Sequence, residues 1–140
     1  MLLATPRPWE SDVVEVFLRP ESCDDYFEIG VGPLGQYLAA HVIKPRVDVD
    51  FQWTSGLRAT AKINEEKRIW QAFCAVPFQP IIEASFLAKL PEVGAAWRLN
   101  LCRITGEEGK REYLAWRPTF SKQPNFHVVS AFGNLIFLGS

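Results

Sequence analysis

The feature that most constrains this chain is an alternation of apolar and polar residues that recurs in short segments. It is clearest in residues 57–63, where Leu57, Ala59, Ala61 and Ile63 alternate with charged or hydroxyl residues. Successive side chains of a β-strand point to opposite faces, so this pattern predicts strands with one buried face. Clusters of Gly, Pro, Asn and Asp separate the segments and predict turns between them.

The same reading predicts a chain made almost entirely of short strands. Strands are expected at residues 12–18, 26–31, 36–43, 47–53, 57–63, 68–76, 95–105, 112–116 and 135–138. The segment 68–76 is largely apolar, so we expect it to be covered on both faces. One short helix is expected near residues 82–90. Many short strands with at most one short helix predict an all-β fold, an antiparallel β-sandwich or jelly roll.

Chain length and net charge further limit the class of protein to which this sequence can belong. The 140 residues are expected to form a single domain, residues 1–140. The net charge of −1 provides no electrostatic basis for binding nucleic acid or an acidic membrane, and neither partner is expected. No apolar run approaches membrane-spanning length.

The cysteines and the N-terminal residues carry little functional information. Cys23, Cys74 and Cys102 are odd in number and lack a paired metal-binding spacing. This favours free thiols over a zinc or redox site, and leaves one disulfide open. The first nine residues have neither the basic start nor the apolar core of a signal peptide, so the sequence assigns no compartment.

Glu15 is the unusual residue of the predicted strand at residues 12–18. It shares a strand face with Val13 and Phe17, and a carboxylate buried among apolar side chains needs a partner. Trp9 precedes the strand, where a loop would place it at the rim of the sheet. An aromatic ring near a carboxylate is a plausible sugar-binding pair, because a flat ring can contact the C–H face of a sugar.

The order of several motifs along the chain resembles that of the family-nine carbohydrate-binding modules and their relatives. No single motif is specific, but together they cover nearly the whole chain: Trp-Glu-Ser-Asp-Val-Val-Glu-Val-Phe-Leu (9–18), Tyr-Phe-Glu-Ile (26–29), Trp70 with Ala-Val-Pro-Phe (75–78), Trp-Arg-Leu-Asn-Leu-Cys-Arg (97–103), Ala-Trp-Arg-Pro (115–118), and Phe-His (126–127) leading to Phe-Gly (132–133). The resemblance implies a β-sandwich that binds sugars without chemistry. Members are usually secreted or periplasmic and are attached to polysaccharide-degrading enzymes.

The resemblance also implies a site. Some members clamp a terminal sugar between two tryptophans, and Trp9 and Trp116 occupy positions similar to that pair, with Glu15 as the nearby carboxylate. The alternative for each tryptophan is that it packs a loop onto the sandwich.

Three further side chains complete the expected ligand-binding set. Arg98 or Arg103 would bind sugar hydroxyls together with Glu15, and Asn100 joins them more weakly. The alternative is a buried ion pair between Glu15 and one arginine that fixes strand register. No cofactor is expected, although the acidic turns at residues 24–28 and 48–50 offer oxygen ligands for calcium.

Two departures from the family pattern lead to a second hypothesis. Members carry several strands before the Trp-Glu-x-Asp run, whereas here eight residues precede Trp9, and Phe73 stands where an acid is usual. Missing strands leave a sheet edge and apolar surface to be covered, which predicts a homodimer. The alternative function is therefore a shortened sandwich that acts as a self-assembling interaction module and has lost its sugar site.

An enzyme is not expected. There is no Gly-x-Ser-x-Gly segment beside which His41 or His127 could complete a Ser-His-Asp triad. Cys–His catalysis, or a glycosidase pair formed by Glu15 and Glu28 on neighbouring strands, stays open on residue types alone.

Overall fold

The computed structural model describes residues 12–140, and this part of the chain is built almost entirely of strands. Its elements in chain order are β1 (Val13–Arg19), β2 (Tyr26–Val31), β3 (Tyr37–Lys44), β4 (Asp48–Asp50), β5 (Arg58–Asn64), β6 (Ile69–Ala75), α1 (Phe78–Ala84), β7 (Ala96–Thr105), β8 (Glu112–Ala115), the 3-10 turn η2 (Val129–Ala131) and β9 (Gly133–Ile136). All of the strand pairs are antiparallel.

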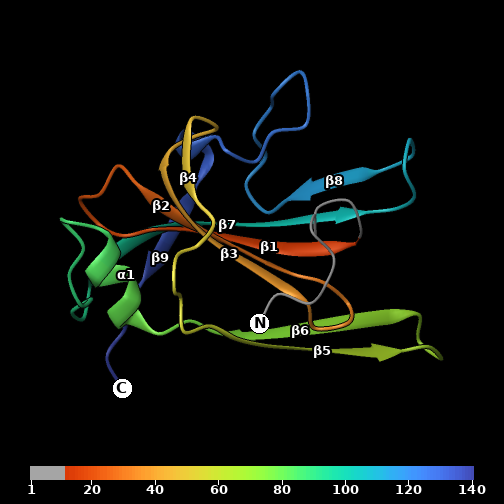
Figure 1. The fold of residues 1–140 in the computed structure, drawn as a ribbon, viewed down its shortest axis with the longest axis horizontal. Coiled ribbons are helices and arrows are strands. Elements are labelled where there is room, and N and C mark those ends of the chain that lie inside the picture. The colour runs from red at the N-terminus through yellow and green to blue at the C-terminus, as the bar shows by residue number, and fades with distance from the viewer. Residues whose placement is uncertain (1–11) are drawn as a thin grey trace.

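The strands form two layers of unequal size. Seven strands make one sheet in the order β4-β3-β2-β1-β7-β8, and β9 pairs with the first half of β7. Strands β5 and β6 form a separate hairpin, which lies across one side of this sheet as the second layer (Figure 1). The predicted fold class is confirmed: the chain is an all-β, antiparallel β-sandwich with one short α-helix.

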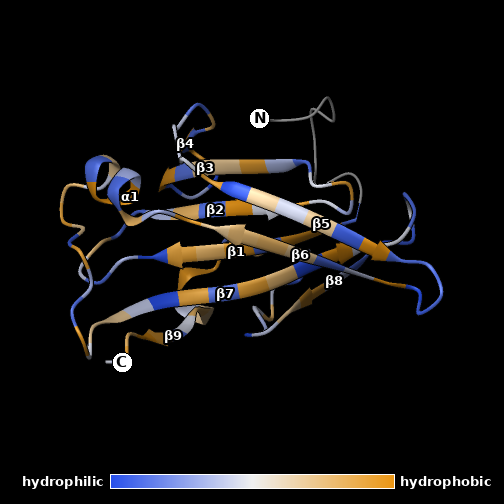
Figure 2. Ribbon diagram, turned by 90° about the horizontal axis from the view of Figure 1, so that it is seen from below, coloured by the Kyte–Doolittle hydropathy of each residue, from blue (hydrophilic) through white to orange (hydrophobic). Residues whose placement is uncertain are grey.

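The alternation of β1 divides the large sheet into two faces. Val14 and Val16 lie on the face toward the β5–β6 hairpin, which we call the hairpin face, and pack with residues of both strands of the hairpin. Glu15 and Phe17 lie on the opposite face. The irregular residues 117–132 cover that face, which we call the loop face, and contribute Phe126, Val129 and Phe132 to its core. Figure 2 shows β5 and β6 crossing over the sheet on the hairpin face.

A third apolar cluster closes the end of the sandwich near α1. Ile81 from the helix packs with Leu18, Phe27 and Trp97 from the sheet, and these side chains are at most 9% exposed. Edge-on contacts join Trp97 to Phe137, which follows β9. The helix, which connects β6 of the hairpin to β7 of the large sheet, thus packs against the end of that sheet.

Two local expectations differ from the structure. The helix begins at Phe78, directly after Pro77, and not near residue 82. Pro80 is in its first turn, where a missing N–H costs no hydrogen bond. Strand β6 was expected to be covered on both faces. One of its faces is instead open, with Phe73 67% exposed, because β6 belongs to a two-stranded layer with nothing from residues 12–140 packed outside it.

Other expectations concern covalent and membrane features. All three cysteines are unpaired. Neither helix described for residues 12–140 has the length and apolarity needed to cross a membrane.

Replacing Phe27 by Ala is expected to destabilise the domain by about 3–5 kcal/mol, because it removes a fully buried ring from the core. Phe86→Ala is the matched control, since the same change at a side chain that is 99% exposed should cost less than about 0.5 kcal/mol. Equilibrium urea unfolding of the two variants measures both values. Equal losses would contradict this assignment of the core.

Candidate functional site

The register of β1 places Glu15 among small neighbours at the centre of the loop face. Glu15 is 5% exposed and lies between Gly30 of β2 and Cys102 of β7. A β-carbon at Gly30 would lie 3.7 Å from Glu15 Cγ and 3.3 Å from Val13 Cγ2, so the glycine leaves room for the acid. Glu28 lies opposite Phe17 in the same register, which makes it a diagonal neighbour of Glu15 on the same face.

These two acids line a hollow on the loop face, which we call the carboxyl pocket. Its volume is about 310 Å³. Glu15 and Glu28 are buried, whereas Tyr113 and Arg46 are exposed and form part of the rim. The side chains that matter most for its chemistry are Glu15, Phe17, Glu28, Tyr113, Phe126 and His127.

A relay of polar side chains connects the pocket to the buried core. The Tyr26 hydroxyl and His127 Nδ1 are 2.7 Å apart, and His127 Nε2 is 3.6 Å from Glu28 Oε2. Burial raises the pKa of Tyr26, so its hydroxyl stays protonated and donates to Nδ1. Burial, with the charge of Arg46, lowers the pKa of His127. The imidazole is therefore neutral near pH 7 and directs its Nε2–H toward Glu28.

The two carboxyls hold protons at unusually high pH. Burial and then the charge of Glu28 raise the pKa of Glu15 to about 8, and burial raises the pKa of Glu28 to about 7. Within residues 12–140, Glu15 forms no ion pair with Arg98 or Arg103. The sequence predicts Arg98 or Arg103 as the partner of Glu15, whereas the carboxyl next to Glu15 on this face is that of Glu28.

Arg98 and Asn100 use their polar atoms to hold the C-terminal part of the chain. Asn100, which is fully buried, donates from Nδ2 to the Arg117 carbonyl at 3.0 Å and accepts from the Arg117 N–H at 2.9 Å. The Arg98 guanidinium donates to the carbonyls of Phe132 and Gly133. Both side chains therefore fasten residues 117–133 to β7, and neither lines the carboxyl pocket.

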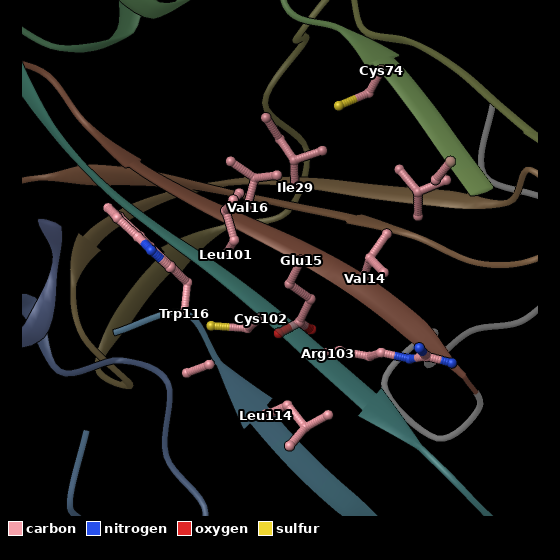
Figure 3. Close-up of a pocket in the computed structure, with 13 residues that line it drawn as sticks. Val14, Glu15, Val16, Ile29, Cys74, Leu101, Cys102, Arg103, Leu114 and Trp116 are labelled. Carbon is pink, nitrogen blue, oxygen red and sulfur yellow. The ribbon is translucent and has the colours of Figure 1, made fainter. Parts of the chain in front are cut away.

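Trp116 and Arg103 lie on the other side of the sheet. They line a largely apolar hollow of about 510 Å³ between the hairpin and the β1–β7–β8 part of the sheet, which we call the apolar groove. Figure 3 shows Trp116 at one end of this groove and Arg103 at the other. Trp116 is 51% exposed and packs on Gly133, where a β-carbon would clash with its ring.

Three of the predicted site residues, Glu15, Arg103 and Trp116, line the apolar groove, and Glu15 also lines the carboxyl pocket. The alternation of β1 directs the Glu15 side chain to the loop face, whereas Arg103 is opposite Val14 on the hairpin face. Trp9 lies outside the described residues, so its proposed pairing with Trp116 stays a prediction.

A Ser–Asp–His cluster lies elsewhere and has the wrong order for nucleophile activation. The Ser85 hydroxyl donates to Asp25 Oδ1 at 2.9 Å, and His41 Nε2 is 2.6 Å from Asp25 Oδ2. The acid lies between the hydroxyl and the imidazole, whereas a hydrolase needs the imidazole in the middle. The Cys102 thiol is also a poor nucleophile, because burial, with the charges of Glu15 and Glu28, raises its pKa to about 12.

Metal ligands do not gather in the described part of the chain. Residues 12–140 contain no group of three or more His, Cys, Asp or Glu side chains placed to hold a metal ion.

Sequence reasoning identified the two acids but not their surroundings. Glu28, like Glu15, is an acid within an apolar strand, and a β1–β2 hairpin brings the two together. Tyr26, Tyr113 and His127 carried no comparable signal. Their proximity depends on β8 and on the path of residues 117–132, which no local pattern specifies.

Comparisons with known proteins identify the fold. No family model matches the chain, and no curated protein matches it. It is similar to the crystal structure of a protein from Bacteroides uniformis ATCC 8492 described as a "putative carbohydrate-binding protein". The TM-score is 0.68 at 21% sequence identity, and the match covers 94% of this chain. The match spans 63% of that protein's length. At this identity the likeness establishes a shared fold and not a shared ligand.

The Glu15→Gln variant tests the environment of the acid. A carboxyl whose pKa is raised in the folded state keeps its proton while the unfolded chain loses it, so folding stability falls as the pH rises. For Glu15 the fall extends from its ordinary pKa of 4.5 to about 8, with a slope of about 1.4 kcal/mol per pH unit at its steepest.

We expect Glu15→Gln to unfold at a higher urea concentration than the natural protein at about pH 8.5, with little difference at about pH 4.5. Glu112→Gln, at an exposed position on β8, is the control and should change neither curve. A Glu15→Gln variant that is less stable at the higher pH would contradict a raised pKa for Glu15.

Proposed function

We propose that this domain is a non-catalytic carbohydrate-binding module and that the carboxyl pocket is its sugar site. The observation that carries the proposal is Glu15. As a residue it is 5% exposed, it lines a hollow with aromatic walls, and its carboxyl has no hydrogen bond or ion pair to another side chain of residues 12–140. A buried polar group without a partner is costly, and a bound ligand can supply that partner.

The other members of the carboxyl pocket suit a sugar. Tyr113 is 43% exposed and lies 6.1 Å from the ring of Phe126, so the two form an accessible aromatic corner. The C–H face of a sugar ring can pack on such a surface. Its hydroxyl groups can both donate to and accept from Glu15 and Glu28, which offer either role according to their protonation.

The shared fold and the chemistry of the site both favour binding without reaction. The similar structure from Bacteroides uniformis belongs to a protein described in terms of carbohydrate binding, and this supports the same class of ligand here. The buried thiol of Cys102 and the Ser85–Asp25–His41 order offer no activated nucleophile.

Isothermal titration with neutral mono- and oligosaccharides and with amino sugars tests the proposal. Tyr113→Ala should weaken binding at least about tenfold, because it removes part of the aromatic surface. Leu114→Ala is the matched control. Leu114 is next to Tyr113 on β8 but lies on the opposite face and lines the apolar groove, so this variant should bind sugar with unchanged affinity. Sugars should be recovered intact, as judged by NMR.

Three results would count against the proposal in different ways. If no sugar binds at millimolar concentration, carbohydrate binding is wrong. If Leu114→Ala or Trp116→Ala abolishes binding while Tyr113→Ala does not, the sugar site is the apolar groove. If the sugar is cleaved, and Glu28→Gln stops the cleavage, the pocket is catalytic.

A second candidate is a self-assembling interaction module, and the apolar groove favours it. Leu101, Leu114 and Trp116 are each about half exposed on the hairpin face, and they form one continuous apolar surface along the groove. Exposed apolar surface of this kind is typical of protein interfaces. A second copy of the chain covering this surface would give the expected homodimer.

The dimer is tested by light scattering at micromolar concentration. The natural protein should have twice the monomer mass, and Leu101→Glu should be monomeric, because a carboxylate cannot be buried without a partner in an apolar interface. Ile136→Glu is the control, because it introduces the same charged side chain at a residue of β9 that is 52% exposed and does not line the groove. A monomeric natural protein would exclude self-assembly at these concentrations.

A further inference from the structure

The carboxyl pocket combines acids and aromatic rings without a buried base. Glu15 and Glu28 are 5% and 7% exposed, and Phe17 is fully buried beside them. Arg46 lines the pocket but is exposed. It is not among the causes that set the pKa of either acid.

The protein leaves the hydrogen-bonding capacity of this pair largely unused. Glu15 has no hydrogen bond or ion pair within residues 12–140. Glu28 has His127 Nε2 at 3.6 Å, which is beyond a normal hydrogen bond. Since His127 is neutral, it brings no positive charge to the pair. Two buried acids therefore face a hollow that can hold a ligand.

The side chains that line the carboxyl pocket indicate which kind of chemical group can bind between Glu15 and Glu28. Aromatic faces attract cations through the negative charge of their π systems, and Phe17, Phe126 and Tyr113 all line the pocket. A bare divalent ion needs more oxygen ligands than two carboxyls, and the described residues hold no third ligand there. An organic ammonium needs fewer fixed ligands, because carboxylates and ring faces both stabilise it.

We propose that the carboxyl pocket recognises a ligand that carries a protonated amino group, and specifically an amino sugar. The ammonium group lies between Glu15 and Glu28, and the sugar ring packs on Tyr113 and Phe126. The choice of a sugar as the carrier rests on the proposed function, whereas the choice of an ammonium rests on the pocket.

Binding of an ammonium group is coupled to protons. Besides Glu15 and Glu28, the titratable or charged groups that line the pocket are Arg46, Tyr113 and His127. Tyr26 contacts His127, and Cys102 is close enough to the two acids for their charges to affect its pKa. Tyr26 and Cys102 stay protonated at neutral pH because burial raises the pKa of each, and His127 is neutral because burial lowers its pKa. The two acids are therefore the groups whose charge changes on binding.

The sign of the pH effect follows from these pKa values. In the free protein Glu15 and Glu28 titrate at about 8 and about 7. A bound ammonium stabilises their ionised forms, so the complex releases protons below those values. Affinity should rise between about pH 6 and about pH 7.5, until the amine of the ligand loses its own proton.

Titration calorimetry of the full chain with D-glucosamine, D-glucose and N-acetyl-D-glucosamine tests the inference. Near pH 7, D-glucosamine should bind at least about tenfold more tightly than either neutral sugar, since a charged hydrogen bond contributes more than about 1.4 kcal/mol. Repeating the titration in buffers of different ionisation enthalpy should reveal net proton release for D-glucosamine alone.

Isosteric variants identify the acids that are responsible. Glu15→Gln and Glu28→Gln should each lower the ratio of D-glucosamine to D-glucose affinity to below about threefold and reduce the proton release. Glu112→Gln on exposed β8 is the control and should leave both quantities unchanged. Thermal unfolding of each variant establishes that it is folded.

The outcomes separate this inference from the proposed function. Equal binding of D-glucosamine and D-glucose overturns the ammonium preference and leaves carbohydrate binding in place. If no sugar binds but tetramethylammonium or cyclohexylamine does, the ammonium site stands and the amino sugar is wrong. If neither sugars nor amines bind, both proposals fail.

Discussion

The central constraint in this domain is the pairing of β1 with strands on both of its sides. β1 pairs with β2 over five residue pairs and with β7 over seven, so it lies within the sheet. The hairpin packs on one of its faces and residues 117–132 pack on the other. Because side chains alternate along a strand, this one segment contributes Val14 and Val16 to the core beneath the hairpin and Phe17 to the core beneath residues 117–132. The same alternation directs Glu15 into the second of these environments. A shift of one residue in register would exchange the two faces and place an acid beneath the hairpin.

The two faces of the sheet offer surfaces of different chemistry. On the hairpin face, a layer of two strands covers only part of a wider sheet, and the uncovered part is the apolar groove that ends at Trp116 and Arg103. On the loop face, an irregular segment bends over the sheet and leaves a smaller hollow above Glu15 and Glu28. Asn100 and Arg98 hold the backbone of that segment, so they support the carboxyl pocket from a distance without lining it. The proposed ligand and the proposed second subunit therefore use opposite faces.

The electrostatics of the carboxyl pocket support the proposal that it binds a ligand. A structural ion pair would satisfy the acids within the protein and lower their pKa values. Here burial raises the pKa of both acids, and the charge of Glu28 raises that of Glu15 further. Such an arrangement reduces folding stability above the ordinary pKa of a carboxyl, and a bound cation or polyol would offset that loss. Perturbed acids that face a hollow are more typical of functional sites than of cores.

The sequence by itself determined the fold class, because the alternation of apolar and polar residues and the turn residues are local patterns that predict β-strands directly. It also marked Glu15 as an acid in an apolar strand. It did not determine which side chains meet. Glu15 was expected beside Arg98 or Arg103, but alternation and register put Arg103 on the opposite face and bring Arg98 to backbone carbonyls. His127, Phe126 and Tyr113 reach the carboxyl pocket only because residues 117–132 fold back across the sheet. Contacts between residues about 100 positions apart, such as that of Tyr26 with His127, depend on tertiary packing and leave no periodic pattern in the chain.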